Sequence, residues 1–213
     1  MRRWLVLLSF VAVAFSAGQA KAQDEGLYDP VAPEGSAFVR VINAGTADKD
    51  AKPELRGKTY NGVDHNEVGA YFPVKQGQAD LAVGTAKASE NLESGAYYTA
   101  VLNGEALTIL KDEALKDQSK ALIGFYNLSG KPLALKTADG KIEVVPSTEN
   151  GKSGAREINP LDIQLAVFEG ETKVSDVPAV ELKRNAATSV VALKDKDGKV
   201  TAIQARATTD TTQ

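Results

Sequence analysis

Hydrophobic and polar positions alternate along this chain in the manner of short β-strands. After residue 35, apolar runs rich in Val, Ile, Tyr, Phe and Thr are separated by clusters of Gly, Asn, Asp and Lys, a pattern typical of an all-β sandwich or barrel. A first series of strands is predicted at residues 37–43, 70–74, 78–83, 97–102 and 107–110. A second series is predicted at residues 121–128, 132–137, 141–145, 162–168, 179–182, 189–193 and 199–205.

A weak internal repeat relates the two series of strands. Residues 37–43 align without gaps with residues 121–127, and each run is an apolar strand closed by an asparagine. The closing hairpins of the two halves correspond as well, with residues 98–102 placed on residues 189–193. Chance similarity between sandwich strands is the alternative, because a single sequence defines topology poorly.

These patterns predict an all-β protein with two tandem β-sandwich domains. We expect an N-terminal domain over residues 36–118, a C-terminal domain over residues 119–207 and a disordered tail over residues 208–213. Residues 112–120 are charged and indicate a linker or a single helical turn. Residues 23–35 contain prolines and a glycine, which favour an irregular leader.

The first 22 residues have the features of a cleaved secretory signal peptide. Two arginines precede an apolar run over residues 4–15, and Ala20 and Ala22 form a small-x-small cleavage motif. The apolar run is shorter than the roughly 20 residues that a transmembrane helix needs, which argues against an uncleaved anchor. We therefore expect cleavage between Ala22 and Gln23 and export of the mature protein.

Composition argues against several classes of function. Removal of Arg2, Arg3 and Lys21 from the 25 basic residues leaves 22 against 28 acidic ones, a net charge of about −6. Such a charge disfavours nucleic acid and anionic membrane surfaces as partners. The chain has no cysteine, so neither disulfides nor thiol catalysis are available. Its single tryptophan, Trp4, lies in the signal peptide.

The sequence offers little for catalysis. The single histidine, His65, lies in a polar stretch at residues 60–67 whose Asn-Gly pair is typical of a turn. Asp64, His65 and Glu67 are candidates for an acid–base or metal cluster, and a solvated loop histidine is the alternative. No Gly-x-Ser-x-Gly elbow accompanies the histidine. We therefore predict a protein that is not an enzyme and has no catalytic residues.

Motifs for metals and cofactors are weak. One histidine without cysteine does not meet the needs of zinc, and no Gly-x-x-x-x-Gly-Lys phosphate loop is present. Residues 194–199 place two acids before a glycine but lack the further ligands of a calcium loop, so a solvated hairpin turn is favoured. Asn127-Leu128-Ser129 matches the glycosylation sequon at a strand end and is interpreted as incidental. We expect no cofactor and no metal site.

Adjacent aromatic residues are candidates for contact with a partner. Neighbouring residues of a strand point to opposite faces, so one member each of Tyr71-Phe72 and Tyr97-Tyr98 should face outward. Exposed aromatics are enriched at protein interfaces, and ordinary cross-strand packing is the alternative. Together with Tyr28 of the leader, these four residues are the predicted partner contacts.

The opening of the mature chain resembles a known family. Residues 27–44 read Leu-Tyr-Asp-Pro-Val-Ala-Pro-Glu-Gly-Ser-Ala-Phe-Val-Arg-Val-Ile-Asn-Ala and follow a signal peptide in a cysteine-free chain of this length. This segment resembles the alginate biosynthesis protein AlgF family. The resemblance implies a periplasmic protein that serves O-acetylation of alginate, alongside a membrane acetyl-donor protein and periplasmic acetyltransferases. It brings no catalytic residues with it.

Residues and resemblance together favour a non-catalytic adaptor that bridges components of an acetylation complex, since sandwich domains present loops and strand edges to partners. A carbohydrate-binding module that holds the polymer is the alternative. Net negative charge disfavours that alternative for a polyuronate, unless Lys131, Lys136 and Lys141 gather on one face. A third hypothesis, an acetyl carrier or esterase, requires an activated Ser or Thr near His65.

Overall fold

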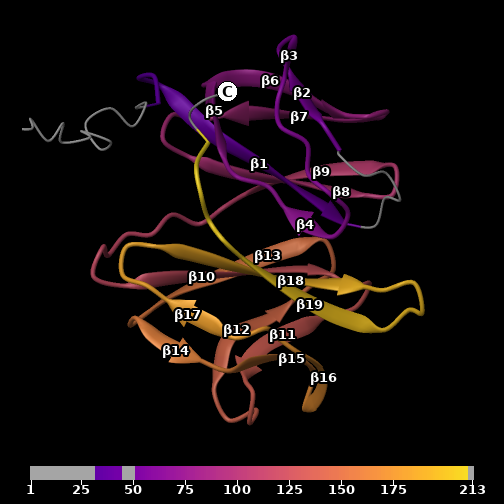
Figure 1. The fold of residues 1–213 in the computed structure, drawn as a ribbon, viewed down its shortest axis with the longest axis vertical. Helices are drawn as coiled ribbons and strands as arrows, with labels where there is room; N and C mark the ends of the chain where they lie inside the picture. Colours follow the sequence, from indigo (N-terminus) through magenta and orange to yellow (C-terminus); the bar gives the residue numbers. More distant parts are fainter. Residues whose placement is uncertain (1–31, 45–50, 211–213) are drawn as a thin grey trace, which may run out of the picture.

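Two β-domains are stacked along the long axis of the molecule (Figure 1). The computed structural model describes residues 32–44 and 51–210. Every regular element in these residues is a strand, which confirms the all-β fold class. None of the described segments forms a helix able to cross a membrane. The predicted signal peptide, its cleavage site between Ala22 and Gln23, and Tyr28 lie outside the described residues.

The first domain is a sandwich of two sheets. One sheet has the strand order β4-β1-β8-β9, and β5 also pairs with β1; the other has the order β3-β2-β6-β7. The strands of this domain are β1 (Ser36–Ala44), β2 (Pro53–Leu55), β3 (Lys58–Thr59), β4 (Glu67–Val68), β5 (Phe72–Lys75), β6 (Gly77–Val83), β7 (Ala86–Leu92), β8 (Tyr97–Asn103) and β9 (Ala106–Lys111).

The core of the first domain follows from the period-two pattern of its strands. β1 turns Val39 and Val41 inward, and β6 turns Leu81 and Val83 toward them. Each of these side chains is at most 2% exposed, and burial of one such side chain contributes about 1.5–3 kcal/mol. The alternate residues of β1 face away from this core.

The second domain has the same general plan. One sheet has the order β13-β10-β18-β19, a second has the order β12-β11-β15-β16, and β14 and β17 form a short ribbon. The strands are β10 (Ala121–Leu128), β11 (Leu133–Thr137), β12 (Glu143–Thr148), β13 (Lys152–Ile158), β14 (Leu161–Ile163), β15 (Leu165–Glu169), β16 (Thr172–Asp176), β17 (Val180–Leu182), β18 (Ala187–Lys194) and β19 (Val200–Arg206). Its core contains Ile123, Phe125 and Leu135, each with no exposed surface.

The internal repeat corresponds to a repeated strand pairing, although its second part is shifted. β1 pairs in parallel with β8, and β10 pairs in parallel with β18. Arg40 lies opposite Thr99, and the aligned Gly124 lies opposite Ser189. Thr99 therefore corresponds to Ser189, where the predicted alignment placed Tyr98. A shift of one residue exchanges the two faces of a strand, and Tyr98 indeed points into the first core.

A third apolar cluster lies between the domains. It is built from the outward faces of the four repeated strands, so the domains pack back to back. On the first domain, Ile42 and Val101 contribute to it, and on the second domain Leu128, Val191 and Leu193 do so. All five are buried. The faces that would meet water in an isolated sandwich are thus covered by the other domain.

Several local predictions differ from the structure. Residues 112–117 have no regular secondary structure and are followed by a turn, so the linker contains no helical turn. Residues 162–168, predicted as one strand, divide at Gln164 into β14 and β15, which belong to different sheets. Strands β2, β3, β4, β7, β13 and β16 lie outside the predicted strands. Polar residues fill much of these strands, so their apolar signal is weak.

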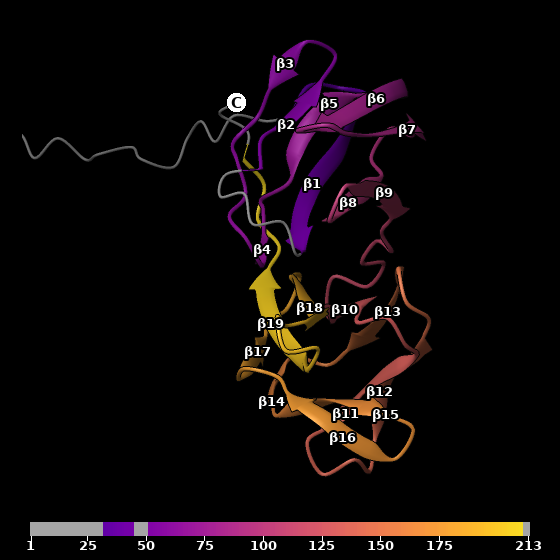
Figure 2. The ribbon, with the colours of Figure 1, turned by 90° about the vertical axis from the view of Figure 1, so that its right-hand side faces the viewer.

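The end of the chain crosses back to the first domain. After β19 the backbone runs along the side of that domain (Figure 2). The amide of Tyr71 donates to the carbonyl of Thr208 at 2.8 Å, and the amide of Asp210 donates to the carbonyl of Tyr71 at 2.7 Å. The disorder expected from residue 208 onward therefore does not apply to residues 208–210, because they find backbone partners in a distant part of the sequence.

Candidate functional site

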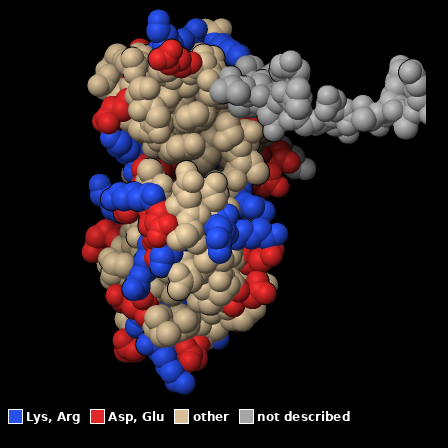
Figure 3. All heavy atoms as spheres, turned by 90° about the vertical axis from the view of Figure 1, so that its left-hand side faces the viewer, with Lys and Arg blue, Asp and Glu red and all other residues tan. Residues whose placement is uncertain are grey.

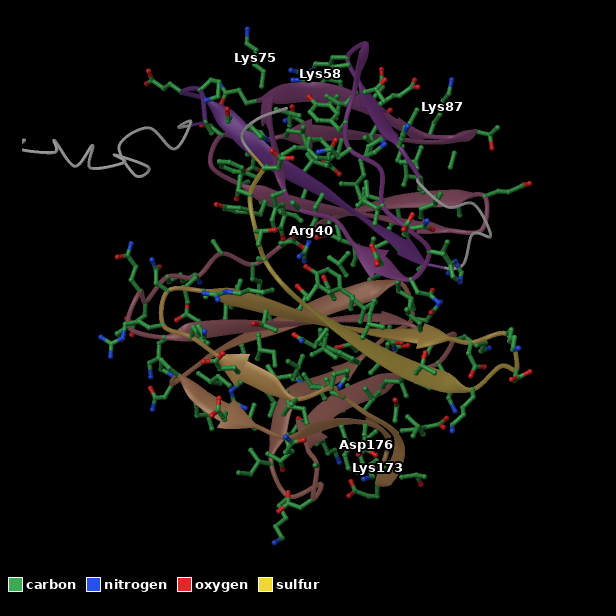
Figure 4. All side chains as sticks on the ribbon, viewed as in Figure 1. Arg40, Lys58, Lys75, Lys87, Lys173 and Asp176 are labelled. Carbon is green, nitrogen blue, oxygen red and sulfur yellow. The ribbon has the colours of Figure 1, made fainter. Side chains whose placement is uncertain are left out.

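A buried arginine lies where the two domains meet. Arg40 is 1% exposed and stands on the outward face of β1. Figure 4 shows it at the boundary between the domains, away from Lys58, Lys75 and Lys87 at the far end of the first domain. Because a guanidinium is charged at ordinary pH, its burial is costly unless hydrogen bonds and polar neighbours replace water.

Arg40 donates hydrogen bonds to residues of both domains. Its Nε donates to Oγ1 of Thr99 at 2.9 Å within the first domain. Its Nη2 donates to the hydroxyl of Tyr126 at 3.0 Å and to Oγ of Ser189 at 2.8 Å. Tyr126 and Ser189 belong to β10 and β18 of the second domain. One side chain therefore fastens the two domains together.

Asp112, the first residue of the linker, supplies the acceptors of the same cluster. Its Oδ2 accepts from the hydroxyls of Tyr71 at 2.8 Å and Thr99 at 2.7 Å, and its Oδ1 accepts from the hydroxyl of Tyr126 at 2.6 Å. The carboxylate is thus engaged by three hydroxyl donors. We call Arg40, Tyr71, Thr99, Asp112, Tyr126 and Ser189 the seam cluster.

Two aromatic rings complete the surroundings of the guanidinium. Its central carbon lies 4.5 Å from the ring centroid of Tyr71 and 5.4 Å from that of Tyr126. Among the described residues, Nη1 of Arg40 is a buried polar atom without a hydrogen-bond acceptor. The negative faces of the rings beside it favour the cation. Arg40 is therefore held both by hydroxyls and by aromatic rings.

Burial governs the ionisation of the cluster. It raises the pKa of Tyr126 to about 12, and it raises the pKa of Tyr71 further above its usual value. In both cases Arg40 opposes the shift and Asp112 adds to it. Burial alone would lower the pKa of Arg40, but Tyr126, Tyr71 and Asp112 outweigh this effect and raise it above its ordinary value. At neutral pH both phenols are protonated donors and Arg40 is a cation.

A glycine in the second repeat leaves room for this arginine. Gly124 occupies on β10 the position that Arg40 occupies on β1. A β-carbon at Gly124 would lie 3.5 Å from Cε2 of Tyr126 and 3.8 Å from Oγ of Ser189. A longer side chain would enter the space beside the hydroxyls that Arg40 binds. The glycine thus allows a single arginine to serve both halves of the repeat.

A cleft opens beside the seam cluster. Its volume is about 440 Å³, within the range of sites that bind small molecules or single side chains. Arg40, Tyr71 and Tyr97 line it from the first domain. Small residues line it from the second domain, namely Gly124, Ser153, Gly154, Ala155, Ala187 and Ser189.

The seam cluster has the parts of a catalytic constellation but little access. The hydroxyl of Thr99 lies 2.7 Å from the carboxylate of Asp112 and 2.9 Å from Nε of Arg40, an arrangement that suits a nucleophile with a base. Thr99, however, has no exposed surface, and Asp112 already accepts two further hydroxyls. The hydroxyl of Thr99 is therefore out of reach of solvent, and Asp112, which lines the cleft, is engaged by three hydroxyls.

The predicted Asp64, His65 and Glu67 cluster lies elsewhere. His65 is exposed on a loop of the first domain and does not line the cleft. Asp64 and Glu67 are exposed as well. Across the described part of the chain, no three His, Cys, Asp or Glu side chains are arranged to hold a metal ion.

The Asp-Gly loop at residues 194–199 is a hairpin turn, as predicted. Oδ1 of Asp195 accepts the backbone amides of Asp197 at 2.9 Å and Lys199 at 2.8 Å. The carboxylate therefore closes the turn between β18 and β19, and the turn is its structural role.

The asparagines that close the repeated strands are buried and structural. Nδ2 of Asn43 donates to the carbonyl of Val63 at 3.0 Å. Nδ2 of Asn127 donates to the carbonyls of Lys131 and Thr148, both at 2.7 Å. Neither asparagine has exposed surface, so the sequon at Asn127 is not presented for glycosylation.

The structure divides the predicted partner contacts. Phe72 and Tyr98 are 3% and 2% exposed and belong to the core of the first domain, so they are not available to a partner. Tyr71 and Tyr97 face the other way and line the cleft. Tyr28 lies outside the described residues. The strand alternation separates each pair as expected, and the outward members line the cleft between the domains.

Sequence reasoning missed Arg40, Asp112 and Gly124. A signal was present, because Arg40 interrupts an otherwise apolar run and Gly124 stands at the same place in the repeat. A charged residue on an outward strand face ordinarily meets water. Only the second domain changes that environment.

The fold and the seam cluster define a class of protein with two tandem β-domains joined through a buried polar cluster. The family model described as Alginate O-acetyl transferase AlgF matches residues 10–191. The chain belongs to the AlgF family of alginate biosynthesis proteins.

Curated relatives agree with this assignment. The chain is 41% identical to the alginate biosynthesis protein AlgF of Azotobacter vinelandii over 164 residues, which cover 76% of this chain and 75% of the relative. It is 36% identical to AlgF of Pseudomonas aeruginosa over 182 residues, which cover 85% and 83%.

Two solved structures are also similar. The C-terminal domain of AlgF from P. aeruginosa is 41% identical, and the match covers 41% of this chain and 98% of that domain with a TM-score of 0.38. The N-terminal domain is 27% identical, and the match covers 39% of this chain and all of that domain with a TM-score of 0.34.

Proposed function

We propose that this protein is a non-catalytic periplasmic adaptor required for O-acetylation of alginate. It bridges the membrane acetyl-donor protein and the periplasmic acetyltransferases. Family membership supports the pathway, and the signal-like residues 1–22 support export. The observation that carries the adaptor role is the seam cluster, in which Arg40 and Asp112 form hydrogen bonds with hydroxyls of the second domain.

The use of these polar groups argues for a platform. A catalyst needs a nucleophile and a base that a substrate can reach. Thr99 is buried and bonded to Asp112 at the contact between the domains. The cluster and the apolar contact around Ile42 hold the two sandwiches in one arrangement. A fixed arrangement lets surfaces on both domains engage partners at a defined spacing. Under this proposal, the word transferase in the description of the family refers to the activity of the complex that the protein serves.

Polymer binding is the alternative function, and three ion pairs weigh against it. Lys131 pairs with Glu169, Lys136 with Glu171 at 3.0 Å, and Lys141 with Asp139 at 3.4 Å, so each of these lysines has an acidic side chain beside it. Figure 3 shows basic and acidic side chains interspersed over the second domain on the face in view. A polyuronate is bound better by a face of a single positive sign.

Deletion of the protein from an alginate-producing bacterium tests the proposal. We expect polymer to be made and exported with few or no acetyl esters, measured as acetyl groups per uronate. Complementation with the His65→Ala variant should restore acetylation fully, because no proton transfer is assigned to His65. Mature protein should also capture purified acetyltransferase in a pull-down.

Two outcomes contradict the proposal. If the deletion abolishes the polymer itself, the protein acts before acetylation. If purified protein releases acetate from acetylated polymer and loses this activity with His65→Ala, the protein is an acyl-transfer enzyme.

A further inference from the structure

We infer that the cleft between the domains receives an extended segment of a partner protein, with an apolar side chain inside the cleft and a carboxylate at its rim. The inference rests on the proposed adaptor function and names the surface that performs it. It follows from the floor, the aromatic wall and the charge of the cleft.

The floor is open because its residues are small. Ala155 lies opposite Gly124 in the antiparallel pair of β13 and β10. Opposite residues of such a pair share a face, so Ala155 and Gly124 both face the cleft. Leu115 of the linker and Leu122 of β10 add apolar lining. The result is a recess of mixed polarity, with apolar residues on this side of it and space for the side chain of another protein.

The aromatic wall disfavours a sugar ring as the occupant. Tyr97 stacks on Phe38 with ring centroids 4.8 Å apart, and it meets Tyr71 edge to face at 5.0 Å. The ring of Tyr71 carries Arg40 at 4.5 Å. A pyranose stacks on a free aromatic face, whereas these faces are already engaged within the protein. The remaining ring edges suit an aliphatic or aromatic side chain.

The charge at the rim selects a carboxylate. Arg206, at the end of β19, lines the cleft and is exposed, and its guanidinium has no hydrogen bond or ion pair within the described residues. Lys111 is held by Glu93 at 2.7 Å. Two acidic residues are among the described residues that line the cleft. Asp112 is engaged by three hydroxyls, and Glu113 is the other. In a chain of net negative charge, an available arginine at the rim of this recess complements an acidic residue of a partner.

The seam cluster makes this cleft a preformed site. Arg40 and Tyr71 form part of its wall and are fixed by hydrogen bonds to both domains or to the linker. Binding therefore costs conformational entropy of the partner segment, but the adaptor does not lose further conformational entropy at this wall.

The test measures binding of a purified periplasmic alginate acetyltransferase to the full mature protein by calorimetry. Ala155→Trp fills the cleft from its floor, and Arg206→Glu reverses the charge at its rim. We expect each variant to weaken binding about tenfold or more, as for residues at the centre of an interface.

Two matched controls make the same chemical changes elsewhere. Ala106→Trp places the same ring at the exposed tip of the β8–β9 hairpin, and Lys196→Glu makes the same charge change in the turn at the opposite end of β19. Both should bind within about twofold of the unmodified protein. If Ala155→Trp fails to fold by circular dichroism, the exposed Arg206→Glu variant decides.

The outcomes separate this inference from the function on which it rests. Binding that is equal for the unmodified protein, Ala155→Trp and Arg206→Glu overturns the cleft as the docking site and leaves the adaptor function standing. No binding by the unmodified protein overturns both. A mannuronate oligomer is the second probe, and its binding to the unmodified protein but not to Ala155→Trp would assign the cleft to polymer and overturn the inference.

Discussion

Nη2 of Arg40 donates a hydrogen bond of 2.8 Å to Oγ of Ser189, 149 positions later in the chain. Arg40 also binds its register partner Thr99, and Ser189 is the residue that corresponds to Thr99 in the second repeat. A single arginine thus binds the same hydroxyl position of both repeats. The contact between the domains is therefore built from the parallel strand pair that occurs in both of them, β1 with β8 and β10 with β18.

Replacement of Arg40 should destabilise the whole molecule. Arg40→Met removes the cation and leaves the half-buried carboxylate of Asp112 without a counter-charge, so we expect the free energy of unfolding to fall by about 3–5 kcal/mol. Urea denaturation of the mature protein measures this loss. Arg184→Met, at an exposed position, should change stability by less than about 0.5 kcal/mol. Equal stability of both variants would contradict the role of Arg40.

The position of Gly124 should tolerate a methyl group but not a long side chain. A β-carbon there makes ordinary contacts of 3.5 Å or more, so Gly124→Ala should change stability by less than about 1 kcal/mol. Gly124→Leu should cost about 1–3 kcal/mol through overpacking against Tyr126. Thermal unfolding distinguishes the two. A Gly124→Leu variant as stable as Gly124→Ala would show that Arg40 does not need this space.

Each domain should unfold separately when its own core is disrupted. Val39 and Ile123 are at most 1% exposed and belong to different cores, and an unpaired buried charge is costly. We expect Val39→Asp to unfold the first domain and Ile123→Asp to unfold the second, as seen in two-dimensional NMR spectra of the mature protein. Loss of all native signals in either variant would indicate one cooperative unit.

The C-terminal segment should stabilise the first domain at Tyr71. A chain that ends at Ala207 loses the two backbone hydrogen bonds of Tyr71 with Thr208 and Asp210. We expect a loss of about 1–3 kcal/mol and faster hydrogen exchange at the Tyr71 amide. Exchange at Leu81, in the core strand β6, should change less. Unchanged protection of Tyr71 would contradict a structural role for the segment.

The buried phenols should make the protein sensitive to alkali. A tyrosine in the unfolded chain ionises near its ordinary pKa of 10.0, whereas folded Tyr126 ionises with a pKa of about 12. The unfolded state therefore releases its proton first, so stability is complete below about pH 10 and falls as pH rises toward about 12. Tyr71 acts in the same direction. Tyr126→Phe should reduce the slope of unfolding free energy against pH in this window, and an unchanged slope would contradict the buried, protonated state.

Much of the architecture could be predicted from local pattern. The apolar runs at residues 37–43 and 121–128 predicted strands there, and these are β1 and β10 of the structure, because a strand that covers a core carries apolar side chains on its inner face. The first part of the repeat was visible for the same reason. Strands β7 and β13 were not visible, since small or polar residues stand at several of their positions.

The sequence by itself determined the strand-rich class, the two cores and the candidates for outward-facing aromatics. Only the tertiary structure decided what the outward faces do. Arg40, Thr99 and Tyr126 become a buried cluster because two domains pack back to back, and Asp112 and the returning tail join them from distant positions. Local periodicity reports which face of a strand a residue occupies. It cannot report which distant surface covers that face, because that depends on contacts between residues far apart in the chain.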